Sequence, residues 1–185
     1  MVKEVIAKIL RKVINKLPPP RIIMNHDYTQ TPYLSRYYIM GAPKMDDGSF
    51  PYDEYGNPKI DARFSNQSFL GITGIYIHCF HRGDSDHELH NHPWKWALSF
   101  VLLNGYMEER RQKDDSVTKK FVKPLRFNYI DANSFHRVDL IDDEPAWTLF
   151  ITGKKHKGWG FWDRNEKQFH HWREFLQNRR EEMVN

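Results

Sequence analysis

The residues best suited to chemistry in this sequence are histidines, and many of them are crowded into one short segment. The chain has 10 histidines, and five of them fall between positions 78 and 92, namely His78, His81, His87, His90 and His92. Neutral imidazole is the commonest metal ligand in proteins, and it changes protonation state near neutral pH. This segment is therefore the part of the chain most able to bind a metal ion or to move protons.

His90 and His92 are separated by one residue in a stretch, 90–103, whose composition is typical of a β-strand. Side chains two positions apart in a strand lie on the same face, so both imidazoles should share the inner face with Trp94, Trp96 and Leu98. Burying a polar group without a partner costs roughly 2–7 kcal/mol. A divalent metal would give both rings a partner, although hydrogen bonds from core histidines to the backbone would do the same.

A third ligand would have to arrive from another strand, and His136 is the best candidate. It opens a predicted strand directly after a turn rich in Asp and Asn, at residues 131–135. Three imidazoles on one ion form a known type of site for divalent transition metals. The alternative for His136 is a residue that caps the turn. His78 and His81 are expected at the surface or behind the ligands.

Many short strands must position these residues. Strands are predicted by β-branched and aromatic content, with turn residues between them, at 33–40, 70–80, 90–103, 106–112, 117–122, 127–130, 136–140 and 146–152. Short strands with close spacing favour a barrel or sandwich over an alternating α/β fold. The body should therefore be all-β, over residues 21–162, with a long loop near 42–58 that is rich in Gly, Pro, Asp and Asn.

Helices are predicted at both ends of the chain. Apolar residues recur every three or four positions in the first segment, which three prolines stop at 18–20, so residues 1–20 form an amphipathic helix and its end. We expect it to pack on the body or on a second subunit; its basic residues leave an anionic membrane or nucleic acid as the alternative. Residues 163–185 should form a closing helix, with Phe169, Trp172 and Phe175 on its inner side.

Composition excludes several classes of protein. Apolar residues make up 39% of the 185 residues and aromatics 15%, which is too much for a disordered chain. Cys79 is the only cysteine, so disulfide scaffolds and thiolate zinc cages are ruled out. No apolar run is long enough to span a membrane. The net charge of +4 is smaller than the positive charge expected of a protein dedicated to binding nucleic acid, so that class is disfavoured. A cytoplasmic protein is expected.

The two histidine segments resemble the two motifs of the cupin superfamily. The first family motif is His-x-His, a short spacer, Glu and, six residues on, Gly; His90, His92 and Gly105 correspond to its ends. The second motif is Pro-x-Gly-x-x-His, where His136 takes the last position and Asp and Asn replace Pro and Gly. The resemblance implies a cupin-type (jelly-roll) barrel.

Two further segments, 145–153 and 159–162, are similar to those of a group of cupin-like proteins from bacteria and their phages. The resemblance covers residues 33–162. It departs from the family at the metal-binding Glu, which should fall at Trp96 or Ala97. The site is then three histidines with water, or another ligand joins it. Glu88 and His87 are the nearest candidates, followed by acidic residues at 84 and 86.

Three functions follow from this resemblance as hypotheses. The first is a metal-dependent enzyme, dioxygenase-like or isomerase-like, acting on a small polar molecule with one divalent Fe, Zn, Ni or Mn ion. Trp94, Trp96 and Arg137 are candidates for its substrate pocket, although strand alternation should point Arg137 away from the metal. The second is a non-catalytic module that binds a ligand or partner and uses a structural metal. The third is a metal-free cupin similar to sugar-nucleotide epimerases. A homodimer is also expected.

Overall fold

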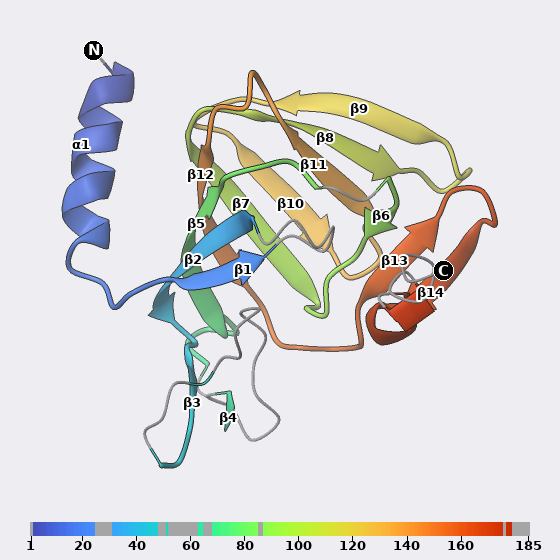
Figure 1. Ribbon diagram of the computed structural model, residues 1–185, viewed down its shortest axis with the longest axis horizontal. Coiled ribbons are helices and arrows are strands. Elements are labelled where there is room, and N and C mark those ends of the chain that lie inside the picture. Colours follow the sequence, from blue (N-terminus) through green and yellow to red (C-terminus); the bar gives the residue numbers. More distant parts are fainter. Residues whose placement is uncertain are drawn as a thin grey trace.

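Buried side chains alternate with more exposed ones along strands such as β12 (Ala146–Thr152), so each sheet has one apolar face. Two antiparallel sheets bury these faces against each other (Figure 1). The computed structural model of the chain describes residues 2–24, 31–47, 51, 63–64, 68–84, 87–175 and 177–178. The first sheet contains, in spatial order, β1 (Arg21–Met24), β2 (Pro32–Met40), β5 (Gly74–Phe80), β12 (Ala146–Thr152), β7 (Trp96–Leu103) and β10 (Phe127–Asp131).

The second sheet lies opposite and contains His90 and His136. Its strands, in spatial order, are β14 (Gln168–His171), β13 (Gly160–Asp163), β6 (Leu89–His90), β11 (His136–Leu140), β8 (Tyr106–Arg111) and β9 (Val117–Val122). A small separate pair joins β3 (Pro43–Lys44) to β4 (Arg63–Phe64). This architecture confirms the predicted all-β, jelly-roll barrel.

The hydrophobic core fills the space between the two sheets. One cluster of buried residues comprises Val101, Tyr106, Val122, Val138 and Ala146. A second cluster comprises Tyr76, Ala97, Ile130 and Phe150. Removing this apolar surface from water is the main stabilising contribution to the barrel. The first cluster joins strands of both sheets, so the apolar core connects the two halves of the barrel.

The predicted strand 90–103 is interrupted in the structure. β6 ends at His90, β7 begins at Trp96, and residues 91–95 between them belong to no strand. Pro93 has no N–H for a sheet hydrogen bond, and the amide of Lys95 bonds to the carbonyl of Lys154 instead. The interruption reverses the faces expected for β7: Ala97 is buried, so the prediction that Trp96 shares the inner face with the histidines was wrong.

The predicted N-terminal helix is present, whereas the predicted C-terminal helix is only partly so. Helix α1 (Val2–Ile14) is present and buries Leu10, but one stripe of its apolar side chains is exposed, namely Val2, Val5, Ile9 and Val13. At the other end, part of the predicted helix over 163–185 is a β-hairpin of β13 and β14, and helical residues begin only at Trp172. The Asp163 carboxylate accepts bonds from the amides of Asn165 and Glu166 and so forms a turn instead of a helix.

Two other expectations are partly outside the described residues. Within the predicted loop near 42–58, Pro43–Lys44 form β3, while residues 48–50 and 52–60 lie outside the part that the structure describes. Among the described residues, none of the helices combines the length and apolar character that crossing a bilayer requires.

Candidate metal centre

Three histidines meet at one end of the second sheet. His90 is the last residue of β6, His136 is the first residue of β11, and the two face each other in antiparallel register. His92 follows from the irregular segment after β6. Ring nitrogens of all three lie within 4.8 Å of one another. The sequence prediction that these three imidazoles converge therefore agrees with the geometry.

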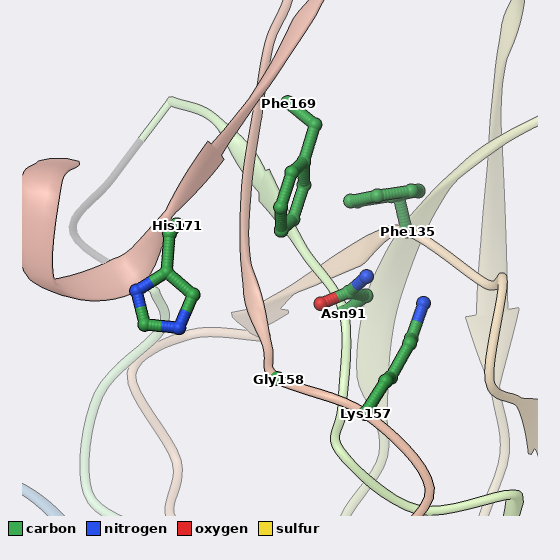
Figure 2. Close-up of a pocket in the computed structure, with 6 residues that line it drawn as sticks. All are labelled: Asn91, Phe135, Lys157, Gly158, Phe169 and His171. Atoms are coloured by element: carbon green, nitrogen blue, oxygen red, sulfur yellow. The ribbon is translucent and has the colours of Figure 1, made fainter.

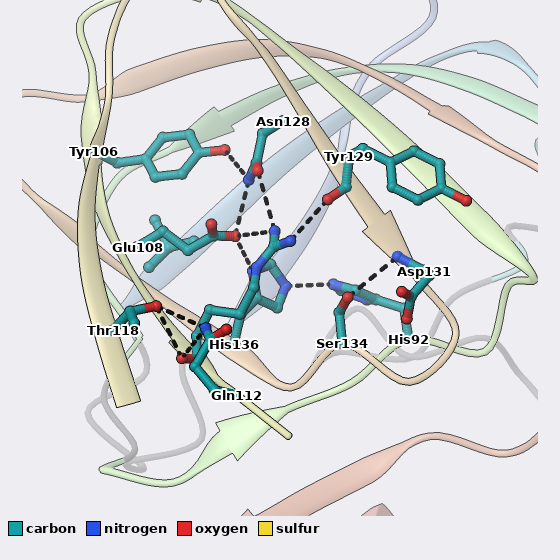
Figure 3. Close-up of polar contacts among 12 residues, drawn as sticks. His92, Tyr106, Glu108, Gln112, Thr118, Asn128, Tyr129, Asp131, Ser134 and His136 are labelled. Carbon is teal, nitrogen blue, oxygen red and sulfur yellow. Dashed lines mark hydrogen bonds and ion pairs between the residues drawn. The ribbon is translucent and has the colours of Figure 1, made fainter. Parts of the chain in front are cut away.

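Nε2 of His92 and Nε2 of His136 are 2.9 Å apart (Figure 3). On its other side, His136 Nδ1 lies 2.8 Å from Glu108 Oε1. A carboxylate can only accept a hydrogen bond, so Nδ1 of His136 carries the proton. Its Nε2 then presents a lone pair towards His92, which is the tautomer required of a metal ligand.

Glu108 is the centre of a buried hydrogen-bond network. Its Oε1 accepts bonds from the guanidinium of Arg110 and from the amide of Asn128, both 2.8 Å long (Figure 3). Asn128 is itself bonded to the Tyr106 hydroxyl at 3.2 Å. Burial alone would raise the pKa of Glu108, but the hydrogen bond and charge of His136, followed by Arg110, lower that pKa to about 2. The carboxylate therefore stays ionised behind His136.

His92 is surrounded by aromatic rings. The indole of Trp94 stacks on it with ring centroids 5.4 Å apart, and the ring of Phe150 lies 6.1 Å away. Desolvation, followed by the charges of His90 and His136, keeps the pKa of His92 well below its usual value. The imidazole is therefore neutral near pH 7, which is the form that coordinates a cation.

A second carboxylate lies behind His90. Nδ1 of His90 is 3.7 Å from Oδ2 of Asp84. The same carboxylate oxygen accepts the backbone amide of Val138 at 2.6 Å, which fixes Asp84 against β11. Two of the three imidazoles thus have a ring nitrogen near an acidic side chain, and such carboxylates orient histidine ligands in metal sites.

Of the other candidate ligands and pocket residues proposed from the sequence, only Trp94 has a ring contact with one of the three histidines within the part of the chain that the structure describes. Among the described residues, the converging set contains neither His87 nor Glu88. Trp94 contacts His92, whereas Trp96 packs against Gly153, where a Cβ atom would come 2.5 Å from the indole nitrogen. Arg137 pairs with Asp139 at 2.6 Å and follows His136 on the strand, so it faces away from the imidazoles as alternation predicted.

Glu108 was missed by reasoning from the sequence. The family pattern placed a carboxylate near Trp96, in the histidine strand itself, and no spacing rule connects that strand to β8. One signal was available. Tyr106, Glu108 and Arg110 are two residues apart in β8 and share one face, so two charged side chains lie on the same face as the ring of Tyr106. A charged residue on an otherwise inner face needs a buried partner, and here that partner is His136.

The structure also contains a surface pocket whose lining includes none of His90, His92 and His136 but does include residues adjacent to them in the chain (Figure 2). Its volume is about 320 Å³, and its lining consists of Asn91, Phe135, Lys157, Gly158, Phe169 and His171. Asn91 stands between His90 and His92, and Phe135 precedes His136. The pocket is therefore lined by chain neighbours of all three histidines.

Asn91 also connects the histidine segment to β13. Its side chain is 1% exposed, and its Oδ1 accepts the backbone amide of the buried Gly160 at 2.9 Å. Asn91→Ala should leave that amide without a partner and lower the free energy of unfolding by about 1–3 kcal/mol. Urea denaturation of the metal-free protein measures this, with the exposed Asn133→Ala as the matched control. Equal midpoints for both variants would contradict this role of Asn91.

Comparisons with known proteins reach only as far as the fold. No protein-family model matches the sequence, and neither does any curated protein. Among solved structures, oxalate decarboxylase of Bacillus subtilis is similar with a TM-score of 0.46 and 14% identity, over 79% of this chain and 30% of that chain. A DMSP lyase from Ruegeria pomeroyi gives a TM-score of 0.44 and 14% identity, over 72% and 52%.

A recombinant oxalate oxidase in complex with glycolate is also similar, with a TM-score of 0.41 and 15% identity over 50% of this chain and 46% of that chain. The chain thus spans about half, or less, of the length of the proteins it resembles. These three proteins have the cupin fold. Their likeness to this chain lies in the two-sheet barrel and does not extend to an activity.

Proposed function

We propose that this chain is a metal-binding protein of the cupin type, which holds one divalent transition metal through His90, His92 and His136. The observation that carries the proposal is the convergence of three ring nitrogens within 4.8 Å. The tautomer of His136 supports it, because the Glu108 carboxylate holds the proton on the far nitrogen. The Nε2 atoms of His92 and His136 lie 2.9 Å apart, and a cation shared between them would contribute more than a single hydrogen bond.

The donor set favours a catalytic ion over a structural one. Structural zinc sites are usually closed by four protein ligands, whereas catalytic sites keep three and leave a position for water or substrate. Among the described residues, the converging group has three members. Three imidazoles suit Fe, Zn, Ni or Mn, and availability selects among them as much as affinity does. A metal held here would act as a Lewis acid, or as a centre for oxidation, next to a small polar molecule.

The residues around the ligands would then have distinct tasks. Glu108 and Asp84 would hold His136 and His90 in position, and Trp94 with Phe150 would exclude water from one side of His92. We propose a dioxygenase-like oxidation or an isomerisation of a small polar substrate as the reaction class. The choice between them depends on the metal, because only a redox-active ion supports the oxidation.

Metal titration tests this proposal directly. Protein purified without an affinity tag is stripped with a chelator and titrated with Zn(II), Mn(II), Ni(II) and, without oxygen, Fe(II). One equivalent should bind tightly, and His90→Ala should weaken binding by about 100-fold or more, because one of three ligands is lost. The matched control is His156→Ala, since that side chain is exposed in the segment after β12.

The outcomes separate the proposed function from its alternatives. Equal affinity in the His90→Ala and His156→Ala variants would overturn the site. A protein that binds no metal at all would favour the metal-free epimerase-like reading. A metal whose removal unfolds the chain would favour a binding module with a structural ion.

A further inference from the structure

The surface pocket of Figure 2 contains a buried amide whose donor has no partner in the chain. Asn91 lines this pocket and is 1% exposed, and its Oδ1 accepts the backbone amide of Gly160 at 2.9 Å. That bond identifies which atom of the side-chain amide is the oxygen. Within the described part of the chain, nothing accepts a hydrogen bond from its Nδ2. A buried donor without a partner is unfavourable, so this nitrogen suits an acceptor that the protein does not supply.

The other polar side chains of the pocket are donors as well. Lys157 is half-buried and ends in an ammonium, which can only donate. Desolvation lowers the pKa of Lys157, and the charge of Asp131 opposes this effect, but among the described residues no carboxylate forms an ion pair with it. The backbone amide of Arg173 donates to Nδ1 of His171 at 3.4 Å, so the proton of the neutral imidazole is on Nε2. The lining contains no acidic side chain, so it is complementary to a group that accepts hydrogen bonds.

The unpartnered nitrogen of Asn91 is turned towards Lys157. In Figure 2 the amide nitrogen of Asn91 lies on the side of Lys157, whereas its oxygen lies on the side of His171. An ionised carboxylate only accepts hydrogen bonds, and those from charged donors are about twice as strong as those between neutral groups. One carboxylate can therefore pair with this nitrogen and with the ammonium together.

Aromatic rings supply the apolar part of the lining. The rings of Phe135 and Phe169 lie edge to face with centroids 6.0 Å apart, and the Phe169 side chain is 43% exposed. Gly158 keeps the pocket open, because a Cβ atom at this position would come 3.1 Å from Nε2 of His171. The volume of about 320 Å³ is at the small end of the range for ligand pockets. It has room for one ring with a short substituent.

We propose that this pocket is a binding site for a small aromatic carboxylate. The carboxylate accepts hydrogen bonds from Nδ2 of Asn91 and from the ammonium of Lys157. The ring of the ligand packs against Phe135 and Phe169, which favour edge-to-face contacts with another aromatic ring. None of the three histidines of the candidate metal centre lines this pocket. The inference therefore goes beyond the proposed function and does not rest on it.

Benzoate binding to the metal-free protein tests this inference. Calorimetric titration at constant ionic strength should show one equivalent bound, and Lys157→Met should weaken binding by about tenfold or more, through loss of a charge-assisted hydrogen bond. Lys154→Met is the matched control, because this lysine is exposed in the same segment, and it should bind as the parent does. Acetate lacks the ring and benzamide lacks the charge, so each should bind at least about tenfold more weakly than benzoate.

A second variant tests the amide itself. Asn91→Asp keeps an oxygen for the Gly160 amide but replaces the unpartnered donor by another acceptor, so benzoate affinity should fall while the contact with β13 is kept. Cooperative thermal melting of both variants shows that the barrel is folded, whether or not the chain binds metal. A parent protein that does not bind benzoate would overturn the inference. Equal benzoate affinity in the parent and Lys157→Met, or equal binding of benzoate and benzamide, would overturn it as well, whatever the metal titrations show.

Discussion

Glu108→Ala should cost about 3–5 kcal/mol of unfolding free energy and weaken metal binding by about 10–100-fold. Both effects come from one buried oxygen. Oε1 of Glu108 accepts bonds from Arg110 and Asn128 and lies 2.8 Å from His136 Nδ1. Alanine removes the carboxylate that pairs with the partly buried guanidinium of Arg110 and leaves that positive charge without its counter-ion. It also releases His136 to rotate, or to move its proton to the nitrogen that should face the metal.

Glu108→Gln separates the two effects. Glutamine keeps the shape and one acceptor oxygen, so the hydrogen bonds to Arg110 and His136 can persist while the negative charge is lost. The stability loss should be smaller than for alanine, whereas metal affinity should still fall below that of the parent. Denaturant unfolding of the metal-free variants and metal titration give the two readouts. Glu144→Ala is the control for a carboxylate removed at the surface, since the Glu144 side chain is 55% exposed and pairs with the exposed Lys3. A Glu108→Ala variant indistinguishable from Glu144→Ala would refute the role given to this network.

The convergence of the three histidines was predictable because the pattern that indicates it lies in two short segments of the sequence. His90 and His92 belong to one short segment, and His136 follows a recognisable turn, so three residues could be named before any contact was known. Their predicted convergence agrees with a register in which His136 pairs with His90. The all-β body was equally accessible, because alternation and turn residues report on each strand separately.

What the sequence could not supply are the pairings between distant strands. Glu108 faces His136 because β8 is the neighbour of β11, and Asn91 bonds to Gly160 because β13 is the neighbour of β6. Strand order is not encoded in the spacing of either residue. The reversed face of Trp96 has a different origin, since a single proline interrupts the strand and a shift of one residue exchanges its two faces. The hairpin of β13 and β14 was missed because aromatic residues suit a helix face and a strand alike.

Adding metal should raise the apparent stability of the protein by about 4 kcal/mol when the free ion is at about 1,000 times its dissociation constant. For a chain of this length, that is a rise in melting temperature of about 10 °C. The reason is mass action, because the folded state gathers the three imidazoles and the unfolded chain does not. The chelated protein should nevertheless remain folded at room temperature. The cluster of Val101, Tyr106, Val122, Val138 and Ala146 packs strands of both sheets against each other, and this apolar contact should hold the barrel together without the ion.

His136→Ala should remove most of that stabilisation. The variant loses one ligand and also the partner of Glu108, so metal should raise its melting temperature by far less than that of the parent, and its metal-free melting temperature should be lower than that of the metal-free parent. Calorimetric melting of both proteins, with metal and then with excess chelator, makes the comparison, and His156→Ala should behave as the parent. Melting curves of the parent that are unchanged by metal would contradict a bound ion at His90, His92 and His136. Unfolding of the parent on chelation alone would instead show that the ion is structural, because a barrel held by its own apolar core has no need of it.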